Sequence, residues 1–278
     1  MGEELSRLYR IAPWPEDPYA EEGRKRYEAA KEEFSDLIKH DWLSELIQSR
    51  EIVRLLDVCG GTGIGGVALA RALRDVGKSV ELTVLDLRRD ALEVAERFGR
   101  EELGEVSVVQ GDATRLADLG LEADVCLVYG LATPHFNPWS MVKLMAGLAD
   151  ALVDDGLLIV EEADRVYTIL YLRGYKEWLP ERASEDRIFV TVHSGYDFRK
   201  GVFKRLGLEL KSGEGPVPME VHFWSLAGLM ALAWPFFEDV DFVAERGRPW
   251  HGFVLAKNPR RKLSSPDFEK TPRTLEAN

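Results

Sequence analysis

The hydrophobic pattern between residues 52 and 164 alternates between short apolar runs and segments with helical spacing. Apolar runs typical of buried strands cover residues 52–58, 80–87, 106–112, 123–130 and 156–164. Between these runs, apolar residues recur every three or four positions in residues 67–76, 89–99 and 138–152. Near-continuous apolar strands separated by helices predict a parallel sheet that is covered by helices on both faces.

The pattern changes on either side of this block. Residues 3–48 read as helices, and a cluster of three prolines leaves Trp14 and Tyr19 in an irregular loop. Residues 165–223 hold only short strand-like pieces and lack the regular alternation. We therefore expect an N-terminal helical lid in residues 1–48 and a substrate cap in residues 165–223, inserted after the fifth strand.

The chain returns to the sheet near its end. Residues 222–234 predict a helix, and residues 238–245 and 250–258 predict two strands. Only residues 246–249 separate these strands, whereas a parallel crossover needs a dozen residues or more. The two strands should therefore form an antiparallel hairpin.

Together these elements predict an α/β fold with a seven-stranded, mostly parallel, doubly wound sheet and an antiparallel last strand. Its Rossmann-like core would comprise residues 49–164 and 224–258. Residues 259–278 are expected to form a polar tail.

The composition narrows the classes of function. The formal net charge is -12, so the average surface repels polyanions and we expect no nucleic-acid partner. No run of about 20 apolar residues is present, and the first ten residues are too acidic and polar for a signal peptide. We therefore expect a cytoplasmic protein without a membrane span.

The sequence has few Asn and Gln side chains and many charged ones, which is a thermophile-like composition.

A glycine-rich loop carries the strongest chemical signal. Gly60, Gly61 and Gly63 follow the first strand of the block and precede a helix. Glycine lets the backbone turn sharply and approach a ligand closely, and a helix N-terminus offers free N–H groups with a partial positive charge. The loop can thus hold a nucleoside and an anionic group. Cys59, beside it, and Cys126 are expected to be free thiols.

The glycine pattern alone does not choose between two cofactors. Gly61, Gly63 and Gly66 also match G-x-G-x-x-G, and Asp86 follows twenty residues later, as in nicotinamide dinucleotide sites. Asp57 argues against a dinucleotide, because a carboxylate three residues before Gly60 repels a pyrophosphate and suits a cationic amino group. The predicted terminal hairpin argues the same way, since the usual dinucleotide sheet is all parallel.

Carboxylates end three successive predicted strands, at Asp57, Asp86 and Asp112. Strand ends of this kind converge on one crevice in an open α/β sheet. A carboxylate at Asp112 can accept a hydrogen bond from the exocyclic amine of adenine. The three side chains therefore predict one nucleoside-binding site.

At this point the sequence resembles the class I, Rossmann-like, S-adenosylmethionine-dependent methyltransferases of the small-molecule type. The segment LLDVCGGTG resembles their first motif, LTVLDL their second and GDATRL their third. The resemblance covers roughly residues 50–165 and 236–258. It implies S-adenosyl-L-methionine as the cofactor.

The resemblance also implies roles for single residues. Asp57 and Gly61 would hold the methionine end of the cofactor, Asp86 both ribose hydroxyls and Asp112 the adenine. The full set of expected cofactor-binding residues is Asp57, Gly60, Gly61, Gly63, Asp86, Leu87, Gly111, Asp112, Ala113 and Tyr129.

The fourth strand leads into a loop that bears on the acceptor. Residues 129–139 lack the D/N-P-P-Y/F/W motif of nucleic-acid amino-methyltransferases. They resemble the Gly-x-x-x-x-His loop of small-molecule methyltransferases, matched by Gly130 and His135. We expect His135 to line the transfer site or to act as a base, with a purely structural role as the alternative.

The expected acceptor contacts come from the cap and the leading helices, and packing in a core is the alternative for each aromatic or histidine side chain there. The predicted catalytic residues are His135, Tyr196 and His222, and the further candidates are Tyr171, His193 and Trp224, with Trp14 and Tyr19 as parts of a lid. Glu161, Glu162 and Asp164 follow the fifth strand and could bind a cationic amine or cap the strand end. We expect no metal.

Three functions follow from these residues. The leading one is S-adenosylmethionine-dependent methyl transfer, N- or O-directed, to a small soluble acceptor. The alternatives are an NAD(P)-dependent oxidoreductase that uses the same glycine loop and a non-catalytic S-adenosylmethionine-binding protein. A homodimer is left open.

Overall fold

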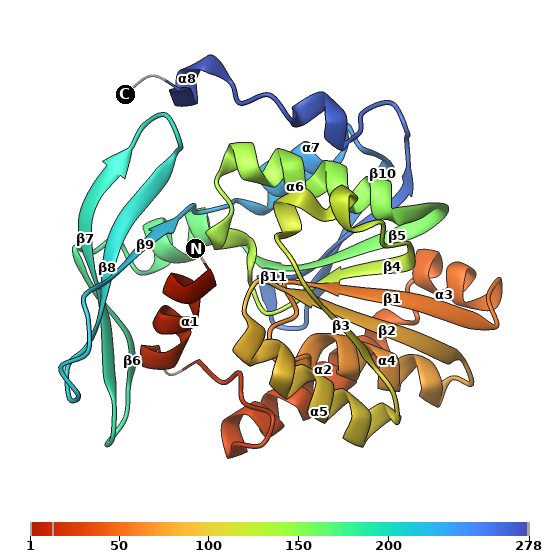
Figure 1. The fold of residues 1–278 in the computed structure, drawn as a ribbon, viewed down its shortest axis with the longest axis horizontal. Helices are drawn as coiled ribbons and strands as arrows, with labels where there is room; N and C mark the ends of the chain where they lie inside the picture. The colour runs from red at the N-terminus through yellow and green to blue at the C-terminus, as the bar shows by residue number, and fades with distance from the viewer. Residues whose placement is uncertain (1, 13, 277–278) are drawn as a thin grey trace.

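The computed structural model describes residues 2–12 and 14–276, and the largest feature of this part is a seven-stranded sheet (Figure 1). The strand order is β10-β11-β5-β4-β1-β2-β3. The strands are β1 (Ile52–Val58), β2 (Ser79–Asp86), β3 (Ser107–Gln110), β4 (Ala123–Val128), β5 (Leu152–Ala163), β10 (Phe237–Glu245) and β11 (Arg248–Pro259). Strands β1 to β5 pair in parallel, whereas β11 pairs antiparallel with both β5 and β10. The predicted sheet and its terminal hairpin are confirmed.

Helices cover both faces of this sheet. One layer contains α2 (Glu21–Leu37), α3 (Asp41–Gln48), α4 (Ile64–Asp75) and α5 (Arg89–Leu103). The other contains α6 (Pro138–Ala151), α7 (Leu226–Ala233) and the short turn η1 (Ala113–Leu119). Because side chains alternate along a strand, Leu55 packs in the first core and Leu56 in the second.

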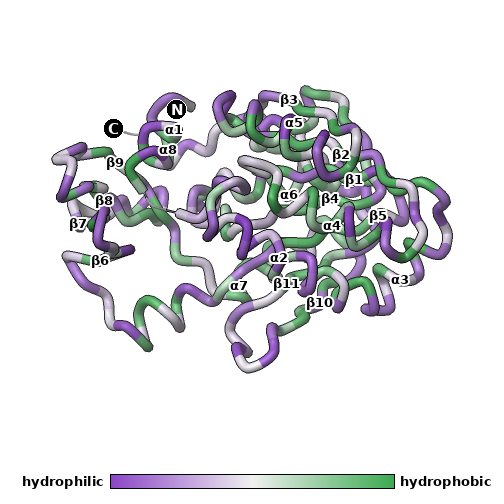
Figure 2. The backbone as a smooth tube through the Cα atoms, turned by 90° about the horizontal axis from the view of Figure 1, so that it is seen from below, coloured by the Kyte–Doolittle hydropathy of each residue, from purple (hydrophilic) through white to green (hydrophobic). Residues whose placement is uncertain are grey.

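A second sheet stands apart from the main body (Figure 2). It contains β6 (Trp178–Ala183), β7 (Ile188–Asp197), β8 (Val202–Glu209) and β9 (Val217–Val221), all antiparallel. A short π-helical segment, η3 (Val166–Leu172), joins it to β5. Helix α1 (Gly2–Ile11) packs on this sheet, where Leu8 and Ile11 form a small core with Phe189. The N-terminal residues are therefore divided, since α2 and α3 belong to the main core and α1 packs on the second sheet.

The last residues run back over α6. The Arg261 guanidinium donates to the carbonyl oxygens of Ala149 and Leu152, each at 2.5 Å. Phe268 packs against Phe236 with ring centroids 5.7 Å apart. The elements here are η4 (Ser265–Phe268) and α8 (Arg273–Glu276). The segment that reads as a polar tail is thus partly anchored to the core.

Candidate functional site

The glycine loop turns the chain from β1 into α4. Cys59, Gly61 and Gly63 have φ values of 60°, 55° and 83°, a region that glycine occupies without strain. A Cβ atom added to Gly60 would lie 2.5 Å from the Asp57 Oδ2 atom. Close packing therefore requires glycine at position 60, and backbone conformation favours it at positions 61 and 63.

The loop forms one wall of a cavity of about 800 Å³ at the carboxyl ends of the parallel strands. Helix α1 and the second sheet form the opposite wall. Of the expected cofactor-binding residues, those that line the cavity are Gly60, Gly61, Asp86, Leu87, Gly111, Asp112, Ala113 and Tyr129. Residues from distant parts of the sequence thus meet around one space large enough for a nucleoside and a small second molecule.

Asp57 and Gly63 stand apart from this wall. Asp57 is fully buried behind the loop, and its Oδ2 atom accepts a hydrogen bond from the Gly66 N–H at 2.8 Å. Burial, opposed by that bond, raises the pKa of Asp57 to about 7. From this position Asp57 supports the start of α4, and a direct contact with a cofactor stays a prediction.

Asp86 and Asp112 do reach the cavity. Asp86 accepts hydrogen bonds from the N–H groups of Gly61 and Arg88, both at 2.8 Å. Asp112 accepts from the N–H of Thr114 at 2.9 Å and from its hydroxyl at 2.7 Å. Each ionised carboxylate has further lone pairs that can accept hydrogen bonds from a ligand.

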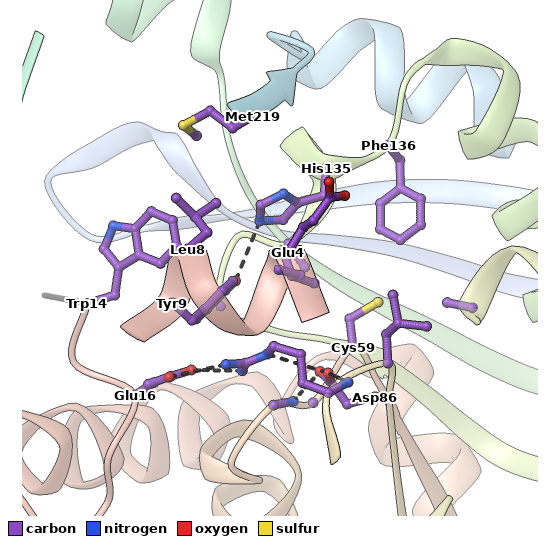
Figure 3. Close-up of a pocket in the computed structure, with 18 of the residues that line it drawn as sticks. Glu4, Leu8, Tyr9, Trp14, Glu16, Cys59, Asp86, His135, Phe136 and Met219 are labelled. Carbon is purple, nitrogen blue, oxygen red and sulfur yellow. Dashed lines mark hydrogen bonds and ion pairs between the residues drawn. The ribbon is translucent and has the colours of Figure 1, made fainter. Parts of the chain in front are cut away.

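An ion-paired cluster ties the N-terminal segment to the end of β2 (Figure 3). The Arg88 guanidinium, only 3% exposed, donates to both carboxylate oxygens of Glu16, at 3.2 and 2.8 Å. It lies 3.8 Å from the ring centroid of Tyr9, and its Nε atom is 3.6 Å from Asp86. Sequence analysis missed Arg88, Glu16 and Tyr9, because the contacts join segments more than 70 residues apart.

His135 lines the cavity on η2 (Thr133–His135), between β4 and α6. Its Nε2 atom lies 3.5 Å from the Tyr9 hydroxyl (Figure 3). Burial, with smaller contributions from Arg165 and Arg88, lowers the pKa of His135 to about 4. The imidazole is therefore neutral near pH 7 and can accept a hydrogen bond.

The remaining wall is apolar near α1 and polar toward β8 and β9. The apolar residues include Leu5, Leu8, Trp14, Phe136 and Met219. The polar ones include Asn137, Ser194, Lys200, Lys204 and Glu220, and the Lys200 Nζ atom lies 3.2 Å from Glu220. This wall can hold a molecule with both an apolar and a polar side.

The other candidate acceptor residues lie outside the described cavity. Tyr196 is 39% exposed and packs on Phe203, and the His222 Nδ1 atom is 2.6 Å from the Gly201 carbonyl oxygen. Tyr171, His193, Trp224 and Tyr19 are likewise not among the lining residues. The catalytic roles predicted for Tyr196 and His222 therefore have no support from the shape of the cavity.

The loop cysteine adds a thiol to the cavity wall. Cys59 and Cys126 are both free, and Cys59 lines the cavity. Burial, together with Asp86, Asp57 and Asp112, raises the pKa of Cys59 well above its usual value.

Two broader features concern the chain as described. In residues 2–12 and 14–276, no group of three or more His, Cys, Asp or Glu side chains is arranged to hold a metal ion. Within the same residues, every helix is too short or too polar to cross a bilayer.

Comparison with known proteins places this site in context. Residues 55–156 match a family model described as a methyltransferase domain. No curated protein matches the sequence.

Solved structures match over most of the chain. The PH0226 protein of Pyrococcus horikoshii OT3 is 19% identical with a TM-score of 0.60, and the match covers 91% of this chain and 98% of that one. The CcbJ methyltransferase of Streptomyces caelestis is 14% identical with a TM-score of 0.62, covering 92% and 97%. CalS10, an amino pentose methyltransferase of Micromonospora echinaspora, is 19% identical with a TM-score of 0.53, covering 85% and 96%. At these identities the likeness shows a shared fold.

Proposed function

We propose that the chain, whose residues 55–156 match a methyltransferase-domain model, is a class I S-adenosylmethionine-dependent methyltransferase that methylates a nitrogen or oxygen atom of a small soluble acceptor. The observation that carries the proposal is the single cavity that joins the glycine loop to His135, α1 and the second sheet. A cofactor on one wall and an acceptor on the other would meet in this space.

The residues on the cofactor wall fit S-adenosyl-L-methionine. A Cβ atom at Gly60 would collide with Asp57 and Val84, so the loop keeps its place along the cavity only with glycine there. The carboxylates of Asp86 and Asp112 suit ribose hydroxyls and an adenine amine. Arg88 is already neutralised by Glu16 and Asp86, which disfavours its use for a pyrophosphate. Arg26 lines the cavity near Gly130 and offers a cation for the cofactor carboxylate.

When bound, the cofactor supplies a methyl group that its sulfonium has already activated. The protein then has to orient the acceptor and exclude water. Neutral His135 would accept a hydrogen bond from the acceptor and turn its lone pair toward the cofactor wall. Tyr9 and Leu8 on α1 would close the cavity to solvent, so we propose α1 as the lid.

Calorimetry is the direct test of cofactor choice. We expect heat of binding with S-adenosyl-L-methionine and none with NADP. The Asp86→Asn variant should lose roughly 10- to 100-fold in affinity, because a hydrogen bond to a charged group contributes about 1.5–3 kcal/mol. The matched control is Asp75→Asn, since Asp75 is exposed at the far end of α4.

Turnover separates the remaining alternatives. A panel of small amines and alcohols, with amino sugars included because an amino pentose methyltransferase shares the fold, is incubated with the cofactor. Formation of S-adenosylhomocysteine supports the proposal. Tight cofactor binding without turnover on any acceptor would favour a non-catalytic binding protein, and heat with NADP alone would favour the oxidoreductase.

A further inference from the structure

The loop of residues 129–137 carries His135 but has few hydrogen bonds of its own. Two backbone bonds close its middle, from His135 N–H to Ala132 at 3.1 Å and from Phe136 N–H to Thr133 at 2.9 Å. Gly130 and Leu131 have φ values of 88° and 58°, and the second is unfavourable for a residue with a side chain. Contacts from outside the loop must therefore hold its shape.

Two consecutive carboxylates of β5 supply such contacts. The Glu161 Oε2 atom accepts a hydrogen bond from the Gly130 N–H at 2.7 Å. The Glu162 Oε2 atom accepts one from the Thr133 hydroxyl, and both of these residues are completely buried. The pair therefore holds both ends of the segment that leads to His135, although neither glutamate lines the cavity.

Glu161 is itself held from the neighbouring strands. The His251 Nε2 atom lies 3.1 Å from Glu161 Oε1, and the His251 Nδ1 atom lies 2.6 Å from Glu245 Oε2. A chain of three side chains thus runs from β10 and β11 to the Gly130 N–H. Because both carboxylate oxygens of Glu161 have a hydrogen-bond partner, its side chain is held in one orientation.

The far side of the loop is held by residues that precede α7. The His222 N–H donates to the Pro134 carbonyl at 2.9 Å, and the buried Trp224 indole donates to the Phe136 carbonyl at 3.1 Å. The loop that carries His135 therefore has two points of attachment to residues 222–224 and two to β5.

We propose that Glu161 and Glu162 are positioning residues for methyl transfer, which hold the 129–137 loop so that His135 faces the acceptor. The proposal rests on the proposed function for the role of His135, and it assigns to the two glutamates neither amine binding nor contact with substrate. Small displacements of a positioning group cost large factors in rate, so the effect should appear in kcat.

The test removes one hydrogen bond at a time without changing shape. Thr133→Val deletes the hydroxyl that donates a hydrogen bond to Glu162, whereas Thr133→Ser keeps a hydroxyl that can make this bond. We expect Thr133→Val to lower kcat about 10- to 100-fold with cofactor affinity within about twofold, and Thr133→Ser to recover most of the rate. Glu162→Gln is the second variant, and Glu238→Gln is the matched control, because Glu238 accepts a hydrogen bond from Asn258 at the opposite end of the sheet.

A spectroscopic measurement keeps the test independent of activity. The imidazole nitrogens of ¹⁵N-histidine-labelled protein report the tautomer and surroundings of His135 by NMR with the cofactor bound. We expect the His135 signals to shift or broaden in Thr133→Val and to return in Thr133→Ser. A purely structural role would lower the melting temperatures of Thr133→Val and Glu162→Gln and leave the His135 signals of the folded protein unchanged.

Two outcomes separate this inference from the proposed function. If His135→Gln turns over like the wild type but Thr133→Val still shifts the His135 signals, the loop is held as proposed and the assigned role of His135 is wrong. If neither Thr133→Val nor Glu162→Gln changes kcat or the His135 signals, the positioning role is overturned.

Discussion

The cluster that joins Arg88 to Glu16 offers a quantitative test of how the N-terminal segment is held. Glu16→Gln removes a charge from a two-point ion pair in which the guanidinium is 3% exposed and the Glu16 side chain 25% exposed. Hydrogen bonds to charged groups contribute about 1.5–3 kcal/mol when buried. The partial exposure of Glu16 reduces this value, so we expect a coupling free energy of about 1–2 kcal/mol.

A double-mutant cycle measures that coupling. Urea unfolding at pH 7 is compared for the wild type, Glu16→Gln, Arg88→Met and the double variant. The sum of the two single losses should exceed the loss in the double variant by the coupling energy. Strict additivity, within about 0.3 kcal/mol, would refute the view that this ion pair holds the segment in place.

Two further predictions concern the glycine loop and His251 on β11, which contacts Glu161. Gly60→Ala should weaken S-adenosyl-L-methionine binding by at least about 100-fold, because its Cβ atom would collide with Asp57 and displace the loop that lines the cavity; calorimetry checks this. The control is Gly77→Ala, which places an alanine at a φ of 84° in a turn outside the cavity, so it should lower stability and leave the affinity unchanged. His251 has its pKa raised by Glu161 and by a second carboxylate, so its contribution to stability is complete below its unfolded pKa of about 6.5 and is lost as the pH rises through the higher folded value. The free energy of unfolding of His251→Gln should therefore depend less on pH above about 6.5, and an unchanged slope would contradict this.

Much of the fold was accessible from the sequence because its signals are local. Buried strands, helical spacing and a four-residue link were enough to predict the sheet and its terminal hairpin. The convergence of Asp86 and Asp112 followed from the parallel strands, whose ends share one edge. Asp57 does not line the cavity as Asp86 and Asp112 do. Its side chain is on the same face of β1 as Leu55, beneath α4, and therefore lies behind the glycine loop.

The acceptor side was less predictable because it depends on strand orientation and distant contacts. A β-bulge between His193 and Gly195 changes which residues of β7 face inward, so that Ser194 lines the cavity while His193 and Tyr196 do not. Choosing residues by chemical type cannot anticipate such a shift. The sequence showed Glu161 and Glu162 as two acidic residues at the end of a strand. It did not show that they accept hydrogen bonds from Gly130 and Thr133 in the 129–137 loop.

The position of Cys59 on the cavity wall exposes its thiol to methylation by a bound cofactor. An alkylating sulfonium held in this cavity would methylate any good sulfur nucleophile within reach, and the reactive form of cysteine is the thiolate. Burial and the surrounding carboxylates keep Cys59 protonated. The acids suited to receiving the cofactor would therefore also protect the protein from modifying itself.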